Sequence, residues 1–171
     1  AVSNHSFFVE FQGAKQYPSQ LVLRDKAMLP ISDTVRLDTT VFNVIVTDRN
    51  GNQNGKAVDV VKVRIKNLDN GDSITVSLSE TGDSTGIFQT DATIAVVDRT
   101  PASSGENQIA MNGGDRVRIW YVDPTDETDS SEAYITSKAN FPLARRGWLK
   151  DTDGNGAVDL LMVEYSTALK Q

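Results

Sequence analysis

Several residue types that would support particular functions are scarce or missing in this chain of 171 residues. It has no cysteine, which excludes disulfide bonds and thiolate metal sites. It has a single histidine, His5, so imidazole acid–base chemistry and histidine-rich metal sites have almost nothing to draw on. No apolar run approaches the roughly 18 residues of a membrane-spanning helix, so we expect no membrane insertion.

Positive charge is also in short supply. Lysine and arginine total 17 against 23 aspartate and glutamate residues, which gives a net charge of −6. The only adjacent basic pair is Arg145-Arg146. Because nucleic-acid binding needs a basic face and the sequence contains no Lys/Arg cluster, we expect no nucleic-acid partner.

What the chain does contain is alternation of apolar and polar residues with a period of two. Residues 61–66, 73–79 and 116–120 alternate in this way, which is typical of antiparallel strands with one buried and one solvent-facing side. No segment of helical length has a convincing 3.6-residue period. Further strands are expected at residues 7–11, 21–24, 41–47, 87–97, 133–137 and 160–165.

Turn signals separate these segments. Asn70-Gly71 lies between two of the clearest strands and predicts a hairpin, since both residues tolerate positive φ. About eight to nine short strands with such turns indicate an all-β fold, an immunoglobulin-like antiparallel β-sandwich. We assign residues 1–145 to this sandwich. Residues 146–171 carry an acidic loop and a final strand, which either completes the sandwich or begins a following module, because one strand cannot form a domain.

The acidic loop has the sequence DTDGNGAVD and spans residues 151–159. Its oxygens fall at the spacing of the first part of an EF-hand calcium loop, and Gly156 occupies the position of the sharp turn. Position 12, where an EF-hand has a bidentate glutamate, is Met162, inside an expected strand. The expected Ca²⁺ ligands are Asp151, Asp153, Asn155, Ala157 (through its carbonyl) and Asp159. The alternative is a solvated acidic turn.

Two further acidic groups are weaker candidates for metal binding. Asp123, Asp126 and Asp129 follow an expected strand and could bind a second ion or complete the first site. The alternative is a polar loop that keeps a sheet edge soluble. Another grouping consists of Asp48, Asn50, Asn52 and Asp98.

Exposed aromatic side chains could instead stack on a sugar. Trp120 and Tyr121 are adjacent in an expected strand, so one should be buried and the other exposed. Trp148 lies beside the acidic loop, on a segment that we expect to be irregular. We take Tyr121 and Trp148 as possible ligand-stacking residues, with core packing as the alternative. The string from Gly82 to Gly86 matches a nucleophile elbow around Ser84, but strands flank it and no histidine follows it, so we expect no enzyme.

Three segments together resemble a module that recurs in large bacterial and archaeal surface proteins. They read VIVTDRN at 44–50, VSLSETGDSTGIF at 76–88 and GDRVRIWYVDPTDETD at 114–129. The DxDGNGxxD loop is similar to calcium-binding loops of immunoglobulin-like repeats in such proteins, and the resemblance covers about residues 40–165. In the turn at 80–88, Glu80 and Thr81 are expected to satisfy backbone groups and Phe88 to plug the core.

These observations predict a non-enzymatic, calcium-stabilised structural or adhesion module. Since a weak oxygen-only site is most useful where calcium is millimolar, we expect an extracellular or cell-surface location in a bacterial surface or secreted protein. The expected partners are neighbouring modules or subunits, which could pair with the terminal strand. The alternative is a carbohydrate-binding module with a structural calcium.

Overall fold

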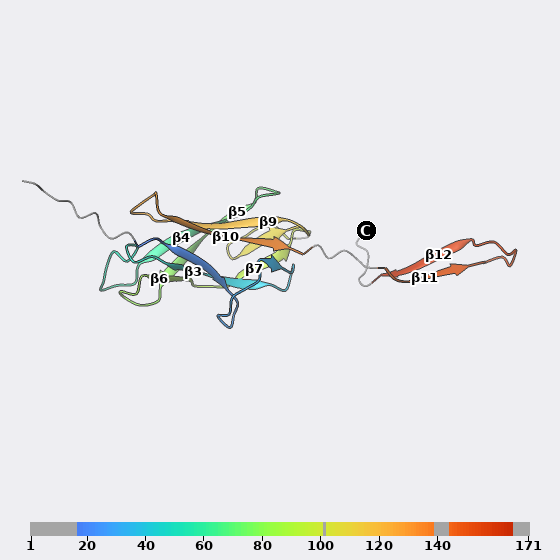
Figure 1. Ribbon diagram of the computed structural model, residues 1–171, viewed down its shortest axis with the longest axis horizontal. Helices are drawn as coiled ribbons and strands as arrows, with labels where there is room; N and C mark the ends of the chain where they lie inside the picture. The colour runs from blue at the N-terminus through green and yellow to red at the C-terminus, as the bar shows by residue number, and fades with distance from the viewer. Residues whose placement is uncertain (1–16, 101, 139–143, 166–171) are drawn as a thin grey trace, which may run out of the picture. The chain divides into compact units, whose positions relative to one another are not determined.

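The computed structural model describes residues 17–100, 102–138 and 144–165 (Figure 1). Within these ranges all regular secondary structure is β-strand, so the expected all-β class is confirmed. The same residues contain no helix that could cross a membrane. The strand expected at 7–11 lies outside the described residues.

Twelve strands are described. Their bounds are β1 (Gln20–Arg24), β2 (Thr34–Val35), β3 (Val41–Thr47), β4 (Val60–Asn67), β5 (Ser73–Glu80), β6 (Ile87–Thr90), β7 (Ile94–Asp98), β8 (Gln108–Met111), β9 (Arg116–Val122), β10 (Ser130–Ser137), β11 (Ala144–Lys150) and β12 (Leu160–Tyr165). The strand expected at 87–97 is two strands, β6 and β7, interrupted at residues 91–93. β2, β8 and β11 were not expected from the sequence.

The chain divides into two compact units, Ala1–Lys138 and Ala139–Gln171. The first contains β1 to β10, and the second contains β11 and β12. The sequence placed a boundary at residue 145, whereas this division puts all of β11 with the acidic loop. In the second unit β12 pairs antiparallel with β11.

In the first unit the hydrogen-bonded order is β2-β10-β9-β4-β5-β6-β3-β7-β8, and β1 pairs with β3. Most neighbours are antiparallel, but β10–β2 and β7–β8 are parallel. β5, β9 and β10 lie on one side of this unit and β3 and β6 on the other (Figure 1). β8 contacts both β4 and β5. The immunoglobulin-like sandwich of eight to nine strands stays a prediction.

Alternation in the sequence decides which side chains are buried. In β4, Val61, Val63 and Ile65 are buried, while the residues between them are exposed. β9 buries Val117, Ile119 and Tyr121, and the residues between them are partly exposed. The hairpin expected at Asn70-Gly71 joins β4 to β5, and Gly71 has a φ of 82°. The buried faces of these strands form one hydrophobic core.

The same alternation corrects one expectation about charge. The outward positions of β4 are Lys62, Arg64 and Lys66, and those of β9 include Arg116 and Arg118. Because β4 and β9 are paired neighbours, these five cations share one sheet face. The sequence has no run of basic residues that would indicate this face, since every second residue of each strand is apolar and buried.

The connection between β5 and β6 contacts the loop after β3, since the Asp48 N–H donates to the carbonyl oxygen of Gly86 at 2.8 Å. The Glu80 carboxylate, which is buried, accepts backbone N–H bonds from Thr85 and Gly86, each at 2.7 Å. Phe88 is fully buried, as expected. Thr81 differs from expectation, because its hydroxyl contacts the Thr85 hydroxyl.

Candidate metal sites

The acidic loop connects β11 to β12. Lys150 pairs with Leu160 across the hairpin, so residues 151–159 form the connection between the two strands. Asp159 closes the loop by donating its N–H to the carbonyl oxygen of Lys150 at 3.1 Å. Gly154 and Gly156 have φ values of 75° and 83°, the left-handed region that glycine adopts without strain.

The loop brings three of its predicted ligands together. Carboxylate oxygens of Asp151, Asp153 and Asp159 lie within 4.8 Å of one another. Such a cluster of oxygen donors could hold a metal ion, and carboxylates suit hard cations. Asn155 lies in the same loop, where its side-chain oxygen accepts the Ala157 N–H at 2.8 Å.

Backbone N–H groups of the loop stabilise the ionised carboxylates. The N–H groups of Gly156 and Gly154 donate to the two oxygens of Asp151 at 2.8 and 2.7 Å, and these bonds lower the pKa of Asp151. The hydroxyl and N–H of Thr152 donate to Asp159 at 2.8 and 2.9 Å, which lowers the pKa of Asp159. Both carboxylates are therefore ionised over a wider pH range than usual.

A second cluster lies in the first unit and is largely buried. It consists of Asp48, Asp123 and Asp129, with carboxylate oxygens again within 4.8 Å of one another. Asp48 follows β3, Asp123 follows β9, and Asp129 precedes β10. Asp48 and Asp123 are 1% and 0% exposed, so two carboxylates are removed from water at this place.

Neutral donors surround these carboxylates. Asp48 accepts the Tyr121 hydroxyl on one oxygen at 2.7 Å, and backbone N–H bonds from Asn50 and Gly51 on the other. Both oxygens of Asp129 accept the Ser19 N–H.

Asp123 is held in the same manner. One of its oxygens accepts the N–H and hydroxyl of Thr125 at 2.6 and 2.7 Å, and the other accepts the side-chain amide of Asn50.

No basic side chain in the described part of the chain forms an ion pair with the buried cluster. The two ion pairs formed among the described residues are Arg99–Asp72 and Arg118–Glu132. Neither includes Asp48, Asp123 or Asp129. Carboxylates that are close together in a low-dielectric interior repel each other, and a bound cation removes that repulsion. The donor set is again oxygen only, so the cluster is chemically suited to a hard cation.

The structure separates some residues that the sequence grouped. Asp126 is partly buried and stands outside the second cluster, since its carboxylate caps its own turn by accepting the Thr128 N–H and hydroxyl at 3.0 and 2.6 Å. These bonds lower the pKa of Asp126, with the Thr128 hydroxyl as the main cause. Asn52 donates to the Ser84 hydroxyl at 3.0 Å. The cluster therefore takes Asp48 from the weakest predicted grouping and leaves Asp126 out.

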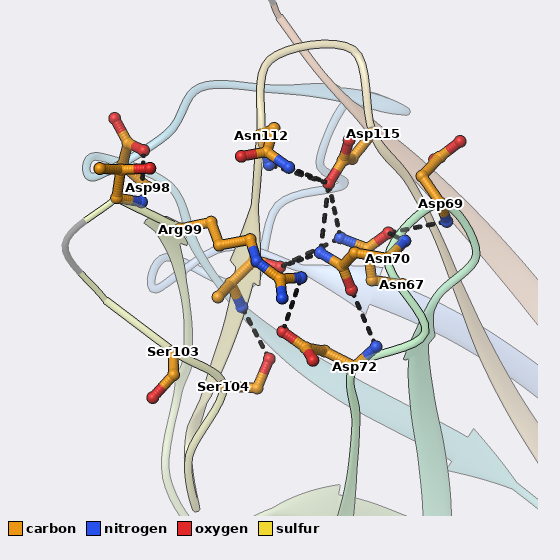
Figure 2. A network of polar contacts seen from close by, with 12 residues as sticks. Asn67, Asp69, Asn70, Asp72, Asp98, Arg99, Ser103, Ser104, Asn112 and Asp115 are labelled. Carbon is orange, nitrogen blue, oxygen red and sulfur yellow. Dashed lines mark hydrogen bonds and ion pairs between the residues drawn. The ribbon is translucent and has the colours of Figure 1, made fainter.

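Asp98 belongs to a different part of the first unit. β7 pairs with the first residues of β3, whereas Asp48 follows the last residue of β3. Figure 2 shows Asp98 and Arg99 beside a polar network that joins three loops. In this network buried Asn67 donates to Asp115 at 2.8 Å, and Arg99 pairs with Asp72 at 3.1 Å. The network links loops to each other and leaves no set of converging carboxylates.

The aromatic expectations have a mixed outcome. Tyr121 is 1% exposed, so its ring cannot stack on a ligand; it is the buried member of the Trp120–Tyr121 pair. Burial and the bond to Asp48 raise the pKa of the Tyr121 hydroxyl above its ordinary value. Trp148 is 44% exposed. It lies in strand β11 opposite Met162, which corrects the expectation of an irregular segment.

Asp48 is the site residue whose role was hardest to predict from the sequence. Its only signal is the order Asp48-x-Asn50-Gly51, in which a carboxylate precedes backbone N–H groups that it can accept. Comparison with known proteins adds no identification. No protein family matches the chain, and no curated protein matches it significantly.

Proposed function

We propose that this chain is a non-enzymatic structural or adhesion module of a surface or secreted protein, stabilised by Ca²⁺. The observation that carries the proposal is the loop of β11–β12. It brings the carboxylates of Asp151, Asp153 and Asp159 within 4.8 Å of one another, and no basic side chain of the described residues pairs with them. An ion there would bridge the two ends of a hairpin loop.

Calcium is the ion that this donor set favours. Ca²⁺ takes six to eight oxygen ligands in flexible geometry, whereas Mg²⁺ demands near-ideal octahedral geometry and keeps several waters. A loop of carboxylates, an amide oxygen and a backbone carbonyl, completed by water, suits the larger ion. Without a bidentate glutamate at position 12, we expect a dissociation constant of about 10⁻⁴ M, in the range of extracellular modules.

The buried cluster in the first unit supports the same function. Asp48 and Asp123 are inaccessible to water, and no basic side chain of the described residues pairs with them. A cation at this cluster would tie the end of β3 to the end of β9, which are not neighbours in the sheet. Its effect would be mechanical, since it stiffens loops and performs no reaction.

The absence of an enzymatic role is also part of the proposal. Ser84, the serine of the elbow-like string, lies in a connection between two strands, where its hydroxyl accepts the amide of Asn52. A nucleophilic serine needs a general base where Ser84 has the amide of Asn52. An amide cannot act as one.

The exposed apolar residues of the hairpin favour assembly through the terminal strand. Leu149 and Leu161 are opposite each other on one face, and Trp148 and Met162 on the other. All four are between 44% and 70% exposed. A two-stranded hairpin is marginally stable alone. We propose that a neighbouring subunit pairs with β12, whose outer edge has one charged residue, Glu164.

Calcium binding is tested by the fluorescence of Trp148 in a Trp120→Phe chain, where it is the only tryptophan. We expect calcium to change its emission with a midpoint near 10⁻⁴ M, and magnesium to do so only at much higher concentration. Asp153→Ala should abolish the change. Asp126→Ala removes one carboxylate outside both clusters and should preserve the change. Equal responses in the two variants would rule out the loop as the binding site.

Assembly is tested separately by sedimentation of the full chain in calcium. Leu161→Lys should shift the chain toward the monomer, whereas Val58→Lys, an exposed loop position, should not. If the unmodified chain is monomeric at every concentration, the proposal of self-assembly through β12 fails while the calcium proposal stands.

A carbohydrate-binding module remains the second candidate, and the exposed ring of Trp148 near the loop favours it. With Tyr121 buried, an aromatic pair can no longer be formed by these two residues. A glycan array probed in calcium with the unmodified chain and with Trp148→Ala separates the two functions, because only glycan binding that is lost in the variant depends on Trp148.

A further inference from the structure

The outer face of four neighbouring strands carries an unusual concentration of positive charge. We call it the basic face. Its outward side chains include Lys62, Arg64 and Lys66 of β4, Arg116, Arg118 and Trp120 of β9, Glu132 and Tyr134 of β10, and Ser73, Thr75 and Ser77 of β5, with exposed Val60 and Val122 at one end. The strands are hydrogen-bonded in the order β10-β9-β4-β5, so this face is continuous.

The strand register places the cations in a row. Lys66 is opposite Arg118, and Arg64 is opposite Trp120. Arg116 lies one outward position beyond Arg118. With about 3.3 Å per residue, the row from Lys62 to Arg116 extends about 20 Å along the strands. This length suits an extended polymer better than a single small ion.

The charge of this face opposes that of the molecule. It holds five cations and one carboxylate, while the whole chain has a net charge of −6. Glu132 is already engaged by Arg118, through contacts of 2.7 and 2.6 Å. Among the described residues, no carboxylate forms an ion pair with Lys62, Arg64 or Lys66. These three charges remain available to a partner.

The aromatic rings of the face are covered by its own arginines. The Arg118 guanidinium lies 4.9 Å from the Trp120 ring, and that of Arg116 lies 4.1 Å from the Tyr134 ring. Single-stranded nucleic acids need open rings on which bases stack. Here the rings instead hold guanidinium groups in place. The face therefore favours a polyanion that is recognised through charge and hydrogen bonds.

A row of hydroxyls runs beside the row of cations. Ser77 is opposite Lys62, Thr75 is opposite Arg64, and Ser73 is opposite Lys66. All three hydroxyl residues are exposed. Asp91 and Glu106 line a pocket together with Thr75 and Ser77, so carboxylates lie at the β5 border of the face and the cations are on β4 and β9. Hydroxyls can donate to and accept from a partner that is itself rich in hydroxyls.

We propose that the basic face binds an acidic polysaccharide whose sugars carry carboxylates. Carboxylates match the fork of the guanidinium group and the point charge of lysine. The sugar hydroxyls match the serine and threonine row. The residues of the basic face belong to neither carboxylate cluster and the binding needs no metal ion, so the proposal is independent of the proposed calcium function.

The test measures binding of the full chain to polygalacturonate in chelator at low ionic strength. Lys62→Gln, Arg64→Gln and Lys66→Gln are combined in one variant. The matched control combines Lys26→Gln, Arg36→Gln and Lys56→Gln, which removes the same charge from exposed positions outside the face. We expect the affinity of the first variant to fall about ten-fold, at roughly two-fold per exposed charge, and that of the control to change less than two-fold.

Binding should weaken as salt is added, and neutral dextran should not bind. Several results would overturn the proposal: no binding of polygalacturonate, equal losses in the two variants, or tighter binding of single-stranded DNA or polyglutamate. Sedimentation at low salt supplies a further check. If the chain self-associates and only the variant of the basic face is monomeric, the partner is a second copy and the polysaccharide proposal is wrong.

Discussion

The Tyr121 hydroxyl donates a hydrogen bond of 2.7 Å to the Asp48 carboxylate, and both side chains are about 1% exposed. Tyr121 belongs to β9 and Asp48 follows β3, so one bond joins strands that are not neighbours in the sheet. It also holds Asp48 beside Asp123 and Asp129. The buried carboxylate cluster is therefore built on a tyrosine whose ring is part of the hydrophobic core.

Removing this hydroxyl should destabilise the first unit. Tyr121→Phe leaves a buried oxygen of Asp48 without its donor, so we expect the free energy of unfolding to fall by about 1–3 kcal/mol. Urea denaturation in chelator measures the change. Tyr134→Phe is the control, because its hydroxyl bonds to exposed Glu132, and it should cost less than about 0.5 kcal/mol. Equal costs would show that the Asp48 contact contributes nothing specific.

Removing the buried charge of Asp48 should distinguish the effect of carboxylate repulsion on stability from the effect of ion binding. Asp48→Asn keeps an oxygen for the N–H groups of Asn50 and Gly51, and its amide can donate to Tyr121. In chelator we expect stability equal to or above that of the unmodified chain, because a like charge is gone.

Calcium should then no longer stabilise this unit. In the unmodified chain, calcium at 100 times its dissociation constant should add about 2.7 kcal/mol. Unfolding followed by Trp120 fluorescence in a Trp148→Phe chain measures both effects, with Asp126→Asn as the control. A calcium increment that survives Asp48→Asn would exclude Asp48 as a ligand.

The turn after β5 should tolerate no side chain at Gly86. Its φ is 60°, and a Cβ there would lie 2.9 Å from the Asp48 carbonyl oxygen and 3.0 Å from the Arg49 Cα. We expect Gly86→Ala to cost about 2 kcal/mol or more, from strain together with the backbone clash. Gly71→Ala is the comparison, because Gly71 also has a positive φ but no neighbour within 4 Å. Thermal unfolding should rank Gly86→Ala as clearly the more destabilising.

The pH dependence of the hairpin loop follows from its depressed pKa values. The pKa values of Asp151 and Asp159 are lowered from the ordinary value of 3.8 by hydrogen bonds to the ionised carboxylates. Their contribution to stability is therefore present above about pH 3.8 and is lost as pH falls through the lower folded values. NMR titration of the carboxyl carbons in chelator measures both. Midpoints at or above 3.8 would contradict the hydrogen-bonding pattern.

The sequence predicted the strands that alternate cleanly, because one side of each is buried in the core. β4, β5 and β9 are examples. It missed β8, whose residues Ile109, Ala110 and Met111 are all buried and therefore show no alternation. β11 was missed because its residues, ARRGWLK, do not alternate between apolar and polar, and all seven are exposed. Pairing with β12, which is not a local property, makes it a strand.

The candidate sites divide in the same way. The hairpin loop could be predicted because all of its carboxylates come from one local segment. The buried cluster could not, because Asp48 and Asp123 are far apart in sequence and meet only through the packing of β3 and β9 against the core. The basic face needed the strand register as well, since its cations alternate with buried residues on two strands.

The most direct test of calcium stabilisation is a calorimetric titration of the full chain with Ca²⁺. We predict a binding heat with a dissociation constant of about 10⁻⁴ M, a stoichiometry that falls by one ion in Asp153→Ala, and an unchanged titration in Asp126→Ala. The absence of any binding heat in the unmodified chain, or an unchanged stoichiometry in Asp153→Ala, would contradict the account.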